Sequence, residues 1–176
     1  MKEINVFDYS NDIMKELQKG ILITTKKDGK VNSMTVSWGH LGIEWGKPIF
    51  VCYIRTGRYT HTMLDSGEFS VNIPLDRKTS SKITSFCGSH SGRDCDKIKE
   101  LGLHLIKGVA IETPAIKELP LTLECKIVYR QNQLSSKLPE NMQKKFYPAN
   151  KDSSFGINHD QHEMFYGEIV KAYIAE

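Results

Sequence analysis

The run Ile49–Phe50–Val51–Cys52–Tyr53–Ile54 is unbroken and apolar, and it leads directly into Arg55–Thr56–Gly57–Arg58–Tyr59–Thr60. It is short and rich in β-branched and aromatic residues, which predicts a buried strand. The residues that follow, up to Ser66–Gly67, predict a short helix. Helix N–H groups and arginine side chains both bind phosphate oxygens, so this junction predicts a phosphate site. Taken singly, each arginine is also typical of a solvated loop.

Length and composition limit the class of protein. The chain has 176 residues, of which 39% are apolar and 26% charged, and we expect one domain over residues 1–176. The net charge of +3 is too small to indicate a nucleic-acid partner. No apolar run is long enough for a membrane span, and the N-terminus lacks the apolar core of a signal peptide. We therefore expect a cytoplasmic protein.

Two groups of cysteines and histidines raise the question of a metal. Cys87, His90 and Cys95 are close in sequence, but their spacing matches no standard zinc pattern. His159 and His162 are three residues apart and have no carboxylate or cysteine partner at a recognisable spacing. We expect no metal site, and we expect the cysteines to be reduced.

Strands outnumber helices in the predicted fold. Six strands are predicted from apolar runs and alternation, over Ile21–Lys27, Lys30–Val36, Ile49–Ile54, Glu68–Pro74, Leu121–Tyr129 and Met164–Ile174. Helices are predicted over Asp8–Lys19, Thr79–Phe86, Asp94–Leu101 and Pro139–Phe146. The strands are mostly linked as hairpins, and no strand is followed by a Gly-x-Gly-x-x-Gly turn. The pattern favours a small antiparallel barrel with peripheral helices over a Rossmann fold.

The segment Asn32–Gly39 has an unusual polar face. On a strand, Ser33, Thr35 and Ser37 point to one side. A row of hydroxyls suits a polyhydroxylated ligand, and Trp38 offers a flat surface for a ring. A solvated face with Trp38 in the core is the alternative interpretation.

Two further segments carry polar groups. Phe86–Lys97 contains glycines that allow a close approach of the backbone to a ligand, and Arg93 and Lys97 add cations at a predicted helix start. Such loops are also common turn material. His159–Glu163 lies just before the last strand.

The order of these segments resembles a known family. The chain contains, in sequence, Asn-Ser-Met-Thr-x-Ser-Trp-Gly, Arg-x-x-Arg-x-Thr, Phe-Ser-Val-Asn-Ile-Pro, Phe-Cys-Gly-x-x-Ser-Gly-Arg-Asp-x-Asp-Lys and His-x-x-Phe-x-Gly-Glu-Ile. This order is similar to that of the flavin reductase-like, FMN-binding split-barrel proteins, and most similar to the flavoredoxin branch. The resemblance extends from about Gly20 to Ile174.

The resemblance implies a six-stranded antiparallel split β-barrel and a homodimer that binds FMN near the interface. Residues implied to line the isoalloxazine and ribityl groups are Asn32, Ser33, Met34, Thr35 and Trp38. Those implied to hold the phosphate are Arg55, Arg58 and Thr60. Those implied to contact the flavin from another side are Ser91, Arg93 and Lys97. The resemblance places His162 near the flavin ring, as the candidate catalytic residue.

Residues 131–160 are not covered by the motifs, and we expect them to form a lid or part of the interface.

The function implied is an oxidoreductase in which the flavin carries the electrons and the protein orients and tunes it. Lys97 or a protonated His162 near the flavin ring would stabilise its reduced anion. NADH or NADPH is the expected electron donor of a reductase. An electron carrier between redox proteins and a non-catalytic flavin-binding module remain alternatives. The Ser-Gly-Arg-Asp segment disfavours the pyridoxamine-phosphate oxidase-like and heme-handling relatives.

Overall fold

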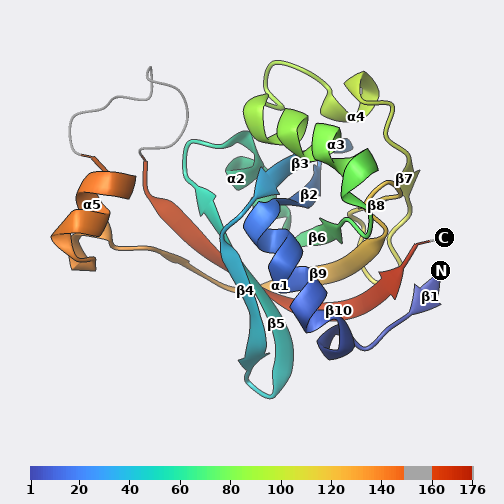
Figure 1. Cartoon of the computed structure of the whole chain (residues 1–176), viewed down its shortest axis with the longest axis horizontal. Coiled ribbons are helices and arrows are strands. Elements are labelled where there is room, and N and C mark those ends of the chain that lie inside the picture. The colour runs from blue at the N-terminus through green and yellow to red at the C-terminus, as the bar shows by residue number, and fades with distance from the viewer. Residues whose placement is uncertain (149–159, 176) are drawn as a thin grey trace.

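The computed structural model describes residues 1–148 and 160–175. One curved antiparallel sheet dominates it (Figure 1). The sheet contains β1 (Lys2–Glu3), β2 (Ile21–Lys27), β3 (Lys30–Val36), β4 (Gly39–Glu44), β5 (Lys47–Arg55), β6 (Glu68–Ile73), β9 (Leu121–Asn132) and β10 (His162–Ile174). A small second sheet pairs β7 (Leu105–Ile106) with β8 (Ala115–Ile116).

The strand order leaves one detail of the expected barrel unconfirmed. All six predicted strands are present, but the main sheet has eight strands in the order β3-β2-β6-β9-β10-β5-β4, with β1 paired to β10. Within the described residues its two end strands, β3 and β4, do not pair. A closed six-stranded barrel is therefore not confirmed, whereas a mainly β, antiparallel fold with peripheral helices is.

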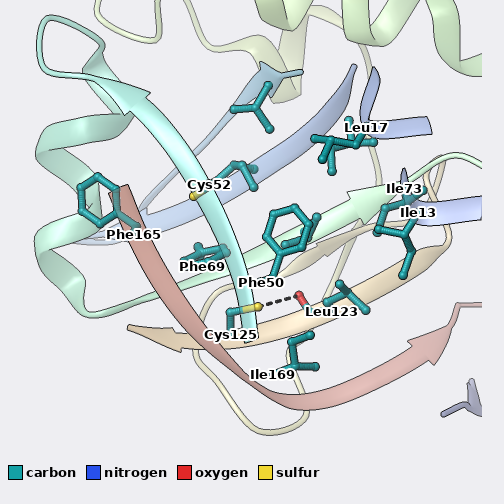
Figure 2. Packing of buried hydrophobic residues seen from close by; sticks show 14 of the residues in the cluster. Ile13, Leu17, Phe50, Cys52, Phe69, Ile73, Leu123, Cys125, Phe165 and Ile169 are labelled. Carbon is teal, nitrogen blue, oxygen red and sulfur yellow. Dashed lines mark hydrogen bonds between the residues drawn. The ribbon is translucent and has the colours of Figure 1, made fainter. Parts of the chain in front are cut away.

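The concave face of the sheet encloses the core (Figure 2). Phe50 of β5, Phe69 of β6 and Phe165 of β10 meet there, and all three are fully buried. Along each of these strands, successive side chains point alternately into this core and toward the opposite face of the sheet, as the period of a strand requires. The β2–β3 hairpin turns at Asp28 and Gly29, with φ of 51° and 76°, which is the left-handed pair that a type I′ turn needs.

The helices cover both faces of this sheet. The remaining helical elements are η1 (Val6–Tyr9), α1 (Ser10–Lys19), α2 (Tyr59–Met63), η2 (Leu64–Ser66), α3 (Arg77–Ser89), α4 (Lys97–Glu100), η3 (Ser135–Lys137) and α5 (Glu140–Phe146). From α1, Ile13 and Leu17 pack into the concave core. From α3, Ile83 packs on Leu22, which faces the other side of β2.

Three predicted helices have different bounds in the structure. The first helix begins at Ser10 after a 3-10 turn, and Gly20, with φ of 107°, ends it. α3 is longer than predicted, because Asp76 caps its N-terminus and the helix continues through Cys87–Gly88–Ser89. Only Lys97–Glu100 of the predicted Asp94–Leu101 helix is helical, with Asp96 as its N-cap.

Residues 133–148, which follow β9, extend from one end of the molecule. They contain η3 and α5, which lies beside the ends of β9 and β10 (Figure 1). The part of the expected lid or interface segment at 149–159 lies outside the described residues. Among the described residues, no helix is long and apolar enough to cross a membrane.

Candidate functional site

A cavity of about 370 Å³ lies where β3 and β5 end and β10 begins. We call it the main cavity. It is lined by Met34, Thr35, Val36, Ser37, Trp38, Tyr53, Arg55, Arg58, Gly88 and His162. Six of these residues were predicted from the sequence: Met34, Thr35, Trp38, Arg55, Arg58 and His162. The antiparallel pairing of β5 with β10, which sets Arg55 opposite His162, joins the two distant segments.

Aromatic side chains form one wall of the main cavity. The Trp38 ring lies 4.8 Å from the His162 ring, centroid to centroid, and 5.2 Å from the Phe146 ring, which meets it edge-on. Trp38 remains 39% exposed, so it is not a core residue. A partly exposed indole, held on two sides, offers a flat apolar surface to a planar ligand.

The predicted phosphate site holds a carboxylate. Asp160 accepts hydrogen bonds from the Thr56 hydroxyl, at 3.1 Å, and from the Gly57 backbone N–H. Arg55 donates to the Asp160 backbone oxygen at 2.6 Å. The loop after β5 therefore binds an anionic group, and in this structure that group belongs to the chain.

The two arginines of this loop are partly buried, and burial lowers the pKa of both. Arg55 also donates to the Phe146 oxygen at 3.3 Å. Arg58 donates to the backbone oxygen of Gly88, at 3.0 Å. A guanidinium has five N–H donors. Within the described residues the Arg58 guanidinium makes only this hydrogen bond, so it keeps other donors for a ligand.

The predicted row of hydroxyls reaches the cavity in part. Thr35 and Ser37 line the main cavity, and the Thr35 hydroxyl donates to the Thr84 backbone oxygen at 2.6 Å. Ser33 is fully buried and bonds the Thr24 hydroxyl at 2.7 Å on the neighbouring strand. Its side chain therefore belongs to the hydrogen bonding inside the sheet.

A second cavity, of about 560 Å³, is lined in part by Asn32, Tyr59, Arg93 and Lys97. Arg93 donates to the Gly57 oxygen at 3.0 Å, and its guanidinium lies 5.5 Å from the centroid of the Tyr59 ring. The predicted flavin-contacting residues are thus divided between two cavities.

Lys97, one of the predicted cations, is buried and hydrogen-bonded inside the protein. It is 3% exposed, and its Nζ donates to the backbone oxygens of Ser33, at 2.8 Å, and Cys87, at 3.1 Å. Burial lowers its pKa. These bonds join α4 to β3 and α3, which makes Lys97 a structural link beside the site.

Three predicted residues line neither cavity: Ser33, described above, Thr60 and Ser91. The Thr60 hydroxyl is buried and accepts a hydrogen bond from the Asn32 amide at 2.8 Å. The Ser91 hydroxyl accepts one from the Arg93 backbone N–H at 3.2 Å. Both stabilise the loops that carry the arginines.

Several residues of the site were not predicted from the sequence. Tyr53 could have been found, since it faces away from its buried neighbours Cys52 and Ile54 on the same strand. Gly88 was placed in a loop but lies in the last turn of α3. No sequence signal indicated Tyr147, whose hydroxyl lies 2.6 Å from Nδ1 of His162.

In the described ranges, 1–148 and 160–175, no three His, Cys, Asp or Glu side chains gather as a metal site would require. Cys52, Cys87, Cys95 and Cys125 are all free. Burial raises the pKa of the Cys87 thiol to about 11, so this cysteine is protonated at neutral pH.

Comparison with known proteins identifies the family. The model of the flavin reductase-like domain matches residues 14–176. The chain belongs to this family. Two curated relatives, uncharacterised proteins of Archaeoglobus fulgidus and Aeropyrum pernix, are each 31% identical, over 56% and 61% of this chain. Those alignments span only 55% and 41% of the relatives' own lengths.

Solved structures of the family have the same fold. Flavoredoxin of Desulfovibrio vulgaris is 23% identical, with a TM-score of 0.65 over 89% of this chain and 69% of its own. Flavoredoxin of Methanosarcina acetivorans is 26% identical, with a TM-score of 0.64 over 89% and 68%. Nitrilotriacetate monooxygenase component B of Bacillus cereus is 16% identical, with a TM-score of 0.66 over 100% and 82%.

Membership in this family supports a flavin cofactor and a flavin-related redox role. The residues of the main cavity fit such a group. An indole face, cationic side chains and a loop that already binds a carboxylate meet at one place.

Proposed function

We propose that the protein is an FMN-dependent oxidoreductase of the flavin reductase type, with the flavin bound in the main cavity. The observation that carries the proposal is the combination of Trp38 with Arg55 and Arg58 in that cavity. The indole suits a planar ring, and the arginines suit a phosphate or a developing negative charge.

The flavin would supply the hydride and electron chemistry, and the chain would bind and tune it. Arg58 and the Gly57 N–H are the candidate phosphate ligands. Met34 and Val36, both buried, give the cavity an apolar part of its lining. Burial, with Arg55 nearby, lowers the pKa of His162 to about 4, so His162 is neutral at neutral pH. Arg55 is therefore the cation expected to stabilise negative charge on the flavin ring.

The electron donor decides between two forms of this function. We propose NADH or NADPH, as for a reductase. The likeness to two flavoredoxins favours, as a second candidate, an electron carrier that serves protein partners.

An anaerobic spectroscopic titration separates these candidates. The FMN-loaded protein is mixed with NADH, then with NADPH, and finally with dithionite. Bleaching of the flavin bands by a nicotinamide nucleotide identifies a reductase. Bands that persist until dithionite is added identify a carrier. Failure to retain FMN at all would contradict flavin binding itself.

We also propose that the protein acts as a homodimer. An exposed aromatic group supports this, since Trp45, Tyr129 and Tyr166 pack together on the outer face of the β4–β5 turn, β9 and β10, and Trp45 is 58% exposed. Exposed apolar patches of this kind often mark interfaces. Sedimentation equilibrium should give a dimer for the wild type and a weaker dimer for Trp45→Ser. A wild-type monomer would contradict the proposal.

A further inference from the structure

His162 is the first residue of β10 and lies between the candidate site and Tyr147, which follows α5. It is 5% exposed, its ring lies against Trp38, and it lines the main cavity. A neutral imidazole has one N–H donor and one acceptor nitrogen. The chemistry that His162 can offer a ligand therefore depends on which of its nitrogens carries the proton.

A chain of hydrogen bonds determines which ring nitrogen of His162 carries the proton. The Tyr147 hydroxyl donates to Oε1 of Gln133 at 2.8 Å and lies 2.6 Å from Nδ1 of His162. A phenol has a single proton, so a Tyr147 hydroxyl that donates to Gln133 can only accept from His162. Nδ1 then carries the hydrogen.

Gln133 is itself fixed to the same histidine. Its backbone N–H donates to the His162 backbone oxygen at 2.8 Å. This bond keeps the end of β9 beside the start of β10. The Gln133 side chain is therefore held close to His162, whose tautomer it influences through Tyr147. Tyr147 is held from its other side by Arg55, whose guanidinium lies 5.3 Å from the Tyr147 ring centroid.

The second ring nitrogen of His162 is left for a ligand. Within the described residues, Nε2 makes no hydrogen bond, whereas Nδ1 is engaged. Arg55, Asp160 and Tyr147 are the charged or titratable groups near the ring. Burial and the Arg55 charge lower the pKa of His162 to about 4, so at neutral pH the ring is neutral and an Nδ1–H ring has a bare Nε2.

We propose that Tyr147 is a positioning residue that holds His162 as the Nδ1–H tautomer, so that Nε2 accepts a hydrogen bond from an N–H group of the ligand in the main cavity. The ligand class is a planar heterocycle with an amide-like N–H, such as the imide of a flavin or the carboxamide of a nicotinamide. This ligand assignment rests on the proposed function, but the tautomer assignment does not.

Nitrogen-15 NMR of histidine-labelled protein without ligand tests the tautomer, and the spectrum of His162→Gln identifies the resonances. At neutral pH the wild type should show a protonated Nδ1 and an unprotonated Nε2. Tyr147→Phe keeps the ring but removes the acceptor, so the Nε2–H tautomer should become the main form. The control is Tyr129→Phe, which removes a hydroxyl that also donates to a glutamine, Gln131, at 2.7 Å but is no part of the cavity. It should leave His162 unchanged.

A wild-type Nε2–H tautomer, or a Tyr147→Phe protein with an unchanged tautomer, would overturn the inference. The ligand is tested next, with FMN alone and with NAD⁺ alone as probes. The probe that shifts the Nε2 resonance provides the N–H donor, and Tyr147→Phe should weaken its binding roughly threefold to tenfold. If neither probe shifts Nε2, the ligand part of the inference is wrong. If FMN binds no variant at all, the proposed function fails while the tautomer result stands.

Discussion

At the scale of single residues, Trp38 is the best test of ring binding. Its indole is 39% exposed and forms a wall of the main cavity. Trp38→Ala should weaken FMN binding by roughly tenfold, because a stacked aromatic contact contributes about 0.5–1.5 kcal/mol beyond the area that it buries. Phe7→Ala, a change at a residue 40% exposed and outside the cavity, is the matched control. Fluorescence titration measures both, and equal affinities would exclude Trp38 from the binding surface.

Asp160 lies in the position predicted for a phosphate. Its carboxylate bonds Thr56 and Gly57, so a ligand phosphate at this loop has to displace it. Asp160→Asn should strengthen FMN binding by about fivefold, or about 1 kcal/mol, because a competing charge is removed. Riboflavin has no phosphate, and its affinity should not change.

Asp12→Asn, a charge removal on the exposed side of α1, should affect neither flavin. An equal gain for FMN and riboflavin in Asp160→Asn would show that Asp160 acts on the ring and not on the phosphate.

At the scale of elements, Gly167 lets β10 pass close to the core. A Cβ at this position would lie 2.5 Å from Phe69 and 2.7 Å from Cβ of Cys125. Gly167→Ala should therefore lower the free energy of unfolding by about 1–3 kcal/mol through overpacking. Gly42→Ala, in the edge strand β4, meets nothing within 4 Å and should change it by less than about 1 kcal/mol. Urea unfolding compares the two, and equal losses would contradict the packing explanation.

The strands that the sequence predicted best are those with buried, alternating faces. β4 was missed because it is an edge strand with glycines at Gly39 and Gly42 and no buried residue, so it shows no apolar alternation. The C-terminal part of α3 was missed for a related reason. Its small and polar residues, Gly88 and Ser89, are typical of a loop, although they form the last turn of α3.

Within the site, the sequence predicted the residues near strand ends but not the contacts between distant segments. Arg55 and Asp160 are 105 residues apart, and nothing local in the sequence relates them. Lys97 is a second example. Its charge suggested a contact with the ligand, but its Nζ donates hydrogen bonds to the backbone oxygens of Ser33 and Cys87 inside the protein. Residue types suited to a site can be recognised from the sequence, whereas the hydrogen-bond partner of each side chain depends on the fold.

At the scale of the whole molecule, Glu163 links the last strand to its surroundings. Its carboxylate accepts two hydrogen bonds from Arg130, at 2.6 and 2.8 Å, and lies 2.6 Å from Nε2 of His61. The Arg130 bond lowers the pKa of Glu163 below its ordinary value of 4.5, against the effect of burial. A lowered folded pKa favours folding above the unfolded pKa, and this contribution is lost as the pH falls below 4.5.

Glu163→Gln should therefore flatten the decline in stability that accompanies a fall in pH below about 4.5. Glu140→Gln is the control, since Glu140 forms an exposed i,i+4 pair with Lys144 and should leave the acid profile unchanged. Thermal unfolding at a series of pH values measures both. An acid profile of Glu163→Gln that parallels the wild type would show that this carboxylate does not contribute.

Above all, we propose that this member of the flavin reductase-like family binds FMN in the main cavity. The most direct test is equilibrium dialysis of the purified chain against FMN, followed by a visible spectrum of the retained flavin. We expect one flavin per chain with perturbed absorption bands, and a clear loss of retained flavin in Arg58→Ala. No retained flavin, or the same retention in Arg58→Ala as in the wild type, would contradict it.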